Sequence, residues 1–100
     1  MRASFIDPRR RIERRLFDIN DRLQKLRAEF GVIEEQLVEL ADQAEEAKVR
    51  AVVAETAFAD HQWDEARRHA EQIAHARDNL RAEIAKLERT QDELIGKLVS

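Results

Sequence analysis

The sequence predicts an all-α fold: a long antiparallel helical hairpin with coiled-coil packing, which we expect to dimerise into a helical bundle. The first observation behind this prediction is a run of apolar residues at alternating spacings of four and three. That repeat is typical of a helix that packs along one side against another helix. A second run of the same kind follows, out of phase with the first. The third observation is composition: two Gly and one Pro interrupt 100 residues, of which 39% are charged and 5% aromatic. Such a composition favours long helices over sheet.

The first helix is predicted to span about residues 8–59, after an N-terminal tail at residues 1–7. The Asp7 carboxylate can accept a hydrogen bond from the first helical turn, and Pro8 suits the first helical position. Gly31 lies off the apolar seam, so we expect the helix to continue through it. The seam of this helix consists of Ile12, Leu16, Ile19, Leu23, Leu26, Phe30, Ile33, Leu37, Leu40, Ala44, Ala47, Ala51, Ala54 and Phe58.

A break in the repeat predicts the turn. The step from Phe58 to Trp63, two equivalent seam positions, is five residues instead of seven, which a continuous coiled coil does not accommodate. We therefore place a turn at 59–62, with Asp60 as the N-cap of a second helix at about 61–99. One continuous helical rod is the alternative. The second seam consists of Trp63, Ala66, Ala70, Ile73, Arg77, Leu80, Ile84, Leu87, Gln91, Leu94 and Leu98.

Unequal helices would leave part of the first seam uncovered. Folding back from a turn near residue 61 brings Leu98 close to Leu23 or Leu26, so the stretch from Ile12 to Ile19 is expected to overhang. Apolar residues without an internal partner imply a dimer or another protein partner. A second apolar stripe, at Val49, Val52 and Val53, would serve a self-associated four-helix bundle or simply remain exposed.

Charge is unevenly distributed along the chain. Residues 1–27 carry nine Lys/Arg and four Asp/Glu, whereas residues 28–65 carry two and eleven. Five arginines gather in the first turns of the first helix, where the helix dipole disfavours cations. They form a solvated charge run, or bind an acidic protein surface such as the 34–46 stretch of a second copy, or bind nucleic acid. The net charge of −3 and the lack of a groove-reading motif make nucleic acid the least favoured of these.

The candidate partner-binding residues combine this basic cluster with the expected overhang. They are Arg10, Arg11, Ile12, Arg14, Arg15, Leu16 and Ile19. Arg77 and Gln91 are polar residues within the second seam, where polar groups specify register. We expect Arg77 to reach a carboxylate such as Glu45; binding an anionic ligand at a dimer interface is its alternative role.

Several kinds of chemistry find no support. There is no Cys, which excludes disulfides and fits a reducing compartment. None of His61, His69 and His75 follows a Glu at the Glu-x-x-His spacing of di-iron bundles, and no nucleophile–base set or phosphate loop is present. No apolar run approaches a membrane span, and the N-terminus lacks a signal-peptide pattern. We expect a soluble, cytoplasmic, non-enzymatic protein without metal or cofactor.

One stretch resembles a known family. Ala66-Arg67-Arg68-His69 and the run from Arg77 to Ile84 resemble the arginine-rich helices of small actinobacterial coiled-coil regulators. These are anti-sigma factors that use cyclic di-GMP and sequester a sporulation sigma factor. The family's ligand motif contains a serine between its charged residues, and no serine lies between Ser4 and Ser100, so no ligand or site residue is carried over.

The resemblance implies a helical hairpin that holds a transcription factor. We therefore expect a protein–protein interaction module, a regulator that binds a transcription-machinery partner through its basic N-terminal arm. The alternatives are a self-assembling structural spacer and a nucleic-acid-associated accessory protein.

Overall fold

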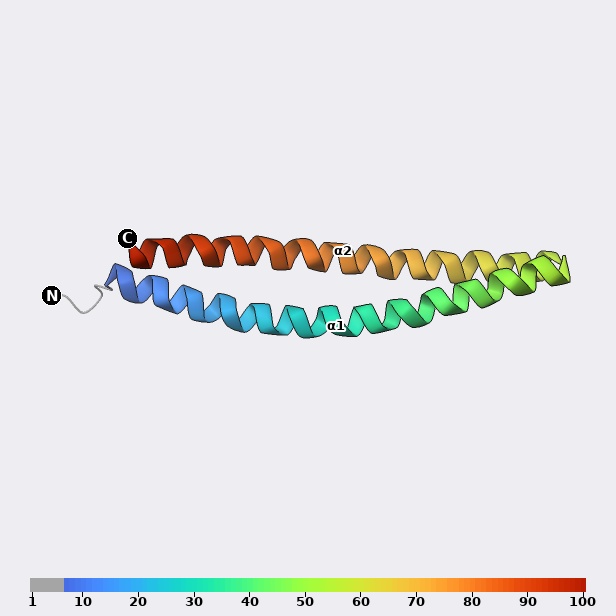
Figure 1. The fold of residues 1–100 in the computed structure, drawn as a ribbon, viewed down its shortest axis with the longest axis horizontal. Coiled ribbons are helices and arrows are strands. Elements are labelled where there is room, and N and C mark those ends of the chain that lie inside the picture. The colour runs from blue at the N-terminus through green and yellow to red at the C-terminus, as the bar shows by residue number, and fades with distance from the viewer. Residues whose placement is uncertain (1–6) are drawn as a thin grey trace.

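The computed structural model describes residues 7–100 and contains two long antiparallel helices (Figure 1). Helix α1 spans Pro8–Ala54 and helix α2 spans Ala57–Val99. Together they form a rod with extents of 79 × 26 × 14 Å. The predicted all-α helical hairpin is confirmed. Of the predicted tail at residues 1–7, residues 1–6 lie outside the described part of the chain.

The start of α1 is the one expected from the sequence. The backbone N–H of Arg9 donates to Asp7 Oδ1 at 3.0 Å, so Asp7 caps the helix and Pro8 follows it. The helix continues through Gly31, where an added Cβ would meet nothing within 4 Å. Gly31 is therefore neither a break nor a point of close helix contact.

The turn lies earlier than predicted, which corrects the expected helix bounds of 8–59 and 61–99. Helix α1 ends at Ala54, and Glu55 adopts the left-handed conformation (φ 52, ψ 42) while its N–H donates to the Ala51 carbonyl. Thr56 caps α2, because its Oγ1 accepts the N–H of Ala59 at 3.1 Å. Asp60 lies within the first turn instead, where its charge favours the helix dipole.

Both seams face the opposite helix. Every first-seam residue from Ile12 to Ala51 is buried or half-buried, and so is every second-seam residue from Trp63 to Leu98. The first seam nevertheless ends before its predicted last members, since Ala54 is exposed and Phe58 is 71% exposed. The buried hydrophobic residues are Leu23, Leu26, Ala47, Ala51, Ala59, Leu80 and Leu94.

The earlier turn also makes the two helices nearly equal, so the predicted overhang is wrong. The Arg9 Nη1 atom donates to the Leu98 carbonyl at 3.3 Å, which places the end of α2 beside the start of α1 and far from Leu23. Ile12 and Ile19 are accordingly half-buried. Helix α2 therefore covers the first seam from Ile12 to Ala51.

Candidate interaction surface

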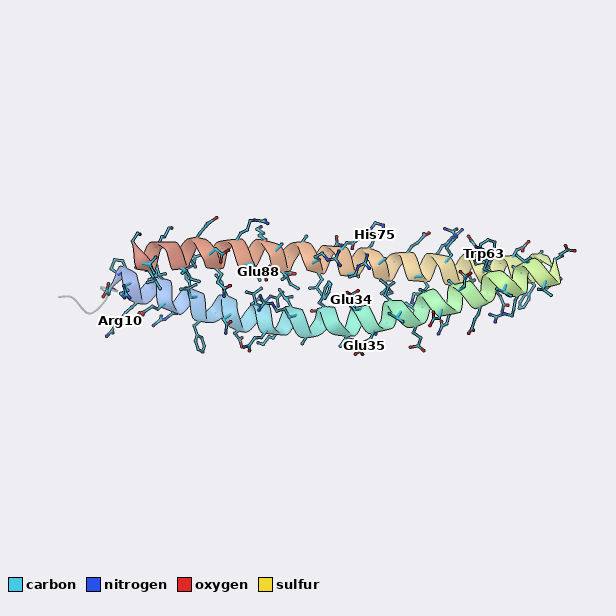
Figure 2. All side chains as sticks on the ribbon, in the orientation of Figure 1. Arg10, Glu34, Glu35, Trp63, His75 and Glu88 are labelled. Atoms are coloured by element: carbon cyan, nitrogen blue, oxygen red, sulfur yellow. The ribbon has the colours of Figure 1, made fainter. Side chains whose placement is uncertain are left out.

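The basic cluster lies at the open end of the rod, opposite the turn. Figure 2 shows Arg10 at this end, near the last turn of α2. Because the helices are antiparallel, the N-terminus of α1 is adjacent to the C-terminus of α2, where cations are favourable. The bond from Arg9 to the Leu98 carbonyl uses this arrangement directly. The unfavourable position of the arginines within α1 is therefore offset inside the hairpin.

Four arginines of the cluster project into solvent. Arg10, Arg11, Arg14 and Arg15 are all exposed. Within residues 7–100 none of them forms an ion pair, whereas Arg22, at 3.1 Å from Glu83, does. The structure thus keeps four of the seven predicted partner-binding residues accessible and half-buries the other three, Ile12, Leu16 and Ile19. Whether any of them binds a partner stays a prediction.

Two cross-helix ion pairs mark the two sides of the seam. Arg22 directly precedes the buried Leu23 and bonds Glu83 at 3.1 Å. Arg27 directly follows the buried Leu26 and bonds Glu88 at 2.7 Å. The residue before Leu23 and the residue after Leu26 therefore lie on opposite sides of the seam. We call the side of Arg22 the groove face and the side of Arg27 the acidic face.

A groove runs along the turn half of the groove face. Two adjoining hollows of about 560 and 440 Å³ share Gln43 and His69. Ala47 and Ala66 form part of the wall of the larger one, and their small side chains leave the space between the helices unfilled. The remaining lining residues are Gln36, Glu39, Leu40, Glu46, Arg50, Gln62, Glu65 and Ile73.

Across the described residues, no group of three or more His, Asp or Glu side chains could hold a metal ion. The groove is a hollow between the two helices, and its wall combines polar side chains with those of Leu40, Ala47, Ala66 and Ile73.

An ion-pair network occupies the start of α2 on the acidic face. Arg67 bonds Asp64 at 2.6 Å and Glu71 at 2.8 Å, and Arg68 approaches Asp64 at 2.8 Å. The hydrogen bond from Arg67 is the main cause that lowers the pKa of Asp64, with smaller contributions from the charges of Arg68 and Arg67. Bonds to Asp64 and Glu71 in turn raise the pKa of Arg67. Arg67, Arg68 and Glu71 are exposed and Asp64 is half-buried, and the network stabilises the helix locally.

Arg77 occupies its predicted seam position but has a different partner. Its side chain is 26% exposed and lies 3.0 Å from Asp78 and 4.0 Å from Glu34, so the expected pairing with Glu45 is wrong. The earlier turn shifts the register on α1 by about three helical turns. In Figure 2, Glu34 lies on the side of α1 that faces α2, whereas Glu35 points away.

Gln91 is half-buried in the second seam, as expected for a polar seam residue. The register-specifying role of Arg77 and Gln91 remains a prediction. Sequence reasoning missed the stacking of the Arg81 guanidinium over Phe30, 5.5 Å from the ring centroid. It also missed the groove, whose only signal was the run of alanines in both seams near the turn.

Large apolar side chains remain uncovered on the outside of the rod. Val49, Val52 and Val53 are 56, 66 and 78% exposed, so the second apolar stripe predicted near the turn is uncovered in the hairpin. Phe17 is 76% exposed near the open end. Exposed apolar residues grouped in this way mark interaction surfaces more often than isolated ones do.

Within residues 7–100, neither helix combines the length and apolar character needed to cross a membrane. Comparison with protein-family models, characterised proteins and solved structures finds no match for this chain. Its function is therefore argued from the geometry of the hairpin.

Proposed function

We propose that the protein is a non-enzymatic protein–protein interaction module, a rigid helical rod that binds partner helices. The observation that carries this proposal is the incomplete burial of the seam. Among its large residues in α1 only Leu23 and Leu26 are buried, whereas Phe30, Ile33, Leu37 and Leu40 are half-buried.

A two-helix seam is open on both flanks, so a further helix can bury what remains. Each Å² of apolar surface removed from water contributes about 25 cal/mol. A partner that covers the flanks of the half-buried residues would therefore bind favourably without any change in the fold.

The basic open end favours an acidic partner surface. Arg10, Arg11, Arg14 and Arg15 offer planar guanidinium groups that bind carboxylates through two parallel hydrogen bonds. The resemblance of the α2 sequence to anti-sigma coiled coils supports a transcription-machinery protein as this partner. A cytoplasmic location agrees with such a role and stays part of the proposal.

The test is capture of partners from the native lysate by the full chain and two variants. One variant replaces Arg10, Arg11, Arg14 and Arg15 with Ser. The control replaces four basic residues of the turn half, Lys48, Arg50, Arg67 and Arg68, and so changes the net charge equally. We expect the first variant alone to lose its captured proteins while both remain helical by circular dichroism. Equal capture by both variants would show that the basic end is not the binding site.

A gel shift at two salt concentrations separates this proposal from nucleic-acid binding. Phosphate contacts release counterions, so binding to nucleic acid weakens steeply as salt rises. We expect no shift at low salt. A strong shift at low salt that vanishes at high salt would favour the accessory-protein alternative. The structural-spacer alternative predicts self-association with no captured partner.

A further inference from the structure

We infer that two copies of the chain pair antiparallel through their groove faces, so that the open end of each copy covers the turn half of the other. The inference rests on the proposed function as a helix-binding module and names a second copy as a partner. It follows from the distribution of charge around the rod and along it.

The two sides of the rod differ in their suitability for self-pairing. Residues seven apart on one helix lie in a row along the same side of the rod. The acidic face contains the α1 rows that begin at residues 10 and 13 and the α2 rows that begin at residues 60 and 64. Those rows hold nine acidic and five basic side chains. On the groove face the α1 rows from residues 11 and 15, and the α2 rows from 58 and 62, hold seven of each. Two acidic faces would repel each other, whereas two groove faces are balanced.

Charge on the groove face is also segregated along the rod. Its open-end half carries six basic and four acidic side chains, and its turn half carries one basic and three acidic ones. An uncharged stretch, made of Val32, Gln36, Gln72, Ala76 and Asn79, separates Glu29 from the acidic residues of the turn half. A face that is basic at one end and acidic at the other is complementary to itself after a two-fold rotation about its middle. Parallel pairing would instead place like charges together.

The groove gives this pairing a place for side chains. It lies in the turn half, with Glu39, Glu46 and Glu65 among its lining residues. In the antiparallel arrangement the exposed Arg11 and Arg15 of one copy lie opposite Glu46 and Glu39 of the other. The long aliphatic stems of arginine can pack along the apolar part of the groove while the guanidinium groups reach its acidic rim.

The groove face is large enough and partly apolar. A stable interface buries about 800 Å² on each partner, which along a 79 Å rod requires a strip only about 10 Å wide. Val32, Val53 and Phe58 lie on this face and are 54, 78 and 71% exposed. Under the two-fold rotation that brings Arg11 opposite Glu46, Val32 lies opposite Lys25, close to the middle of the second copy.

The first experiment measures mass in solution for the full chain and charge-reversal variants. We expect the wild-type chain to be a dimer and Arg11→Glu/Arg15→Glu to weaken dimerisation at least about tenfold, because like charges then face each other. The matched control is Arg10→Glu/Arg14→Glu, which changes the same charge in the same turns but off the groove face. Equal weakening by both variants, or a wild-type monomer, overturns the inference.

Mixing two variants tests the specific pairing. Glu39→Lys/Glu46→Lys should also dimerise weakly alone, yet it should form a heterodimer with Arg11→Glu/Arg15→Glu, since both sets of contacts are then attractive. Glu35→Lys/Glu45→Lys, with the reversed charges off the groove face, should not restore pairing. Failure of the first mixture, or success of the second, contradicts the proposed contacts.

Single cysteines test the orientation, because the chain has none of its own. The contacts of Arg11 with Glu46 and of Arg15 with Glu39 place the two-fold axis beside residues 27–29 of α1, so Glu29→Cys, at an exposed position of the groove face, should form an intermolecular disulfide on oxidation. Phe58→Cys lies at the turn end, and its two copies should remain far apart. Cross-linking through Phe58→Cys would indicate parallel pairing and overturn the inference. A monomer that still captures a partner through its arginines would overturn only this inference and leave the proposed function standing.

Discussion

The open-end half and the turn half of the rod are held together by different means. In the open-end half the buried residues are leucines, Leu23 and Leu26 on α1 and Leu80 and Leu94 on α2. In the turn half they are the alanines Ala47, Ala51 and Ala59. Figure 1 shows the helices drawing together toward the turn. One seam thus combines large buried side chains in the open-end half with small ones in the turn half, where the backbones can approach closely.

This difference separates two sources of stability. Leucines contribute through the apolar area they remove from water, which is large for each residue. Alanines bury little area, so the turn half depends more on local hydrogen bonds, such as the Thr56 cap and the bond from the Glu55 N–H to the Ala51 carbonyl. Substitutions in the two halves should therefore have different effects.

The largest expected effect is in the leucine half. Leu23→Ala removes a side chain that is 0% exposed and should lower the free energy of unfolding by about 2–4 kcal/mol, through lost burial and a cavity. Urea unfolding followed by circular dichroism measures this. Phe17→Ala, at a position 76% exposed, is the control and should change stability little. A loss below about 1 kcal/mol for Leu23→Ala would mean that the seam relaxes around the cavity.

The alanine half should respond to added volume instead. Ala51 is 4% exposed, so Ala51→Leu should force the helices apart beside the turn and cost about 1–3 kcal/mol. Val52→Leu, one residue away and 66% exposed, should be nearly neutral. A stabilising Ala51→Leu in the same urea measurement would show that close helix approach is not needed there.

The cap of α2 should contribute less than either seam. Thr56→Ala removes the acceptor for the Ala59 N–H and should cost about 1 kcal/mol. Thr90→Ala is a matched control, because Thr90 Oγ1 only donates back to the Lys86 carbonyl within the helix. Thermal melts of the two variants should differ. If they coincide, the turn is not stabilised by the cap.

The alternating apolar spacings sufficed to predict two antiparallel helices and nearly all of both seams. They did not locate the turn, because Ala54 and Phe58 extend the first seam's spacing past its end and both Thr56 and Asp60 are suitable caps. The left-handed residue is Glu55, where Gly or Asn would have been the usual signal.

That one misplacement explains the other errors. The overhang of Ile12, the position of Leu98 and the partner of Arg77 all depend on register, and register in a hairpin depends on the turn. The exposed arginines were predictable from their spacing. The groove was not, because it depends on which alanines of the two helices face each other.

Glycine replacement should produce a small gain in the open-end half. Gly31→Ala should raise the free energy of unfolding by about 0.5–1 kcal/mol, since the residue is helical and a Cβ meets nothing within 4 Å. Gly96→Ala, equally unobstructed but in the last turn of α2, should gain less because helix ends fray. Urea midpoints compare the two. A loss at Gly31 would reveal a contact on the acidic face, where Gly31 lies.

The smallest expected effect is that of pH on the turn half. The pKa of Asp64 is lowered in the folded protein, mainly by its bond from Arg67. Its contribution is therefore fully present above the ordinary pKa of 3.8 and is lost as pH falls through the folded value. Asp64→Asn should remove this part of the acid sensitivity, which lies below the ordinary pKa of 3.8. Identical acid profiles for wild type and variant would contradict a role for this pair in stability.

The contact between Arg9 and Leu98 has a mechanical consequence. Because α1 begins and α2 finishes at the same end of the rod, a force applied to those two ends would open the hairpin one seam layer after another, starting at the arginine. The layers would yield singly and at low force, and the Thr56 turn would open last. Pulling instead between the turn and one end would load a single helix along its own axis and would not separate the layers, so the same rod would be weak in one direction and strong in the other.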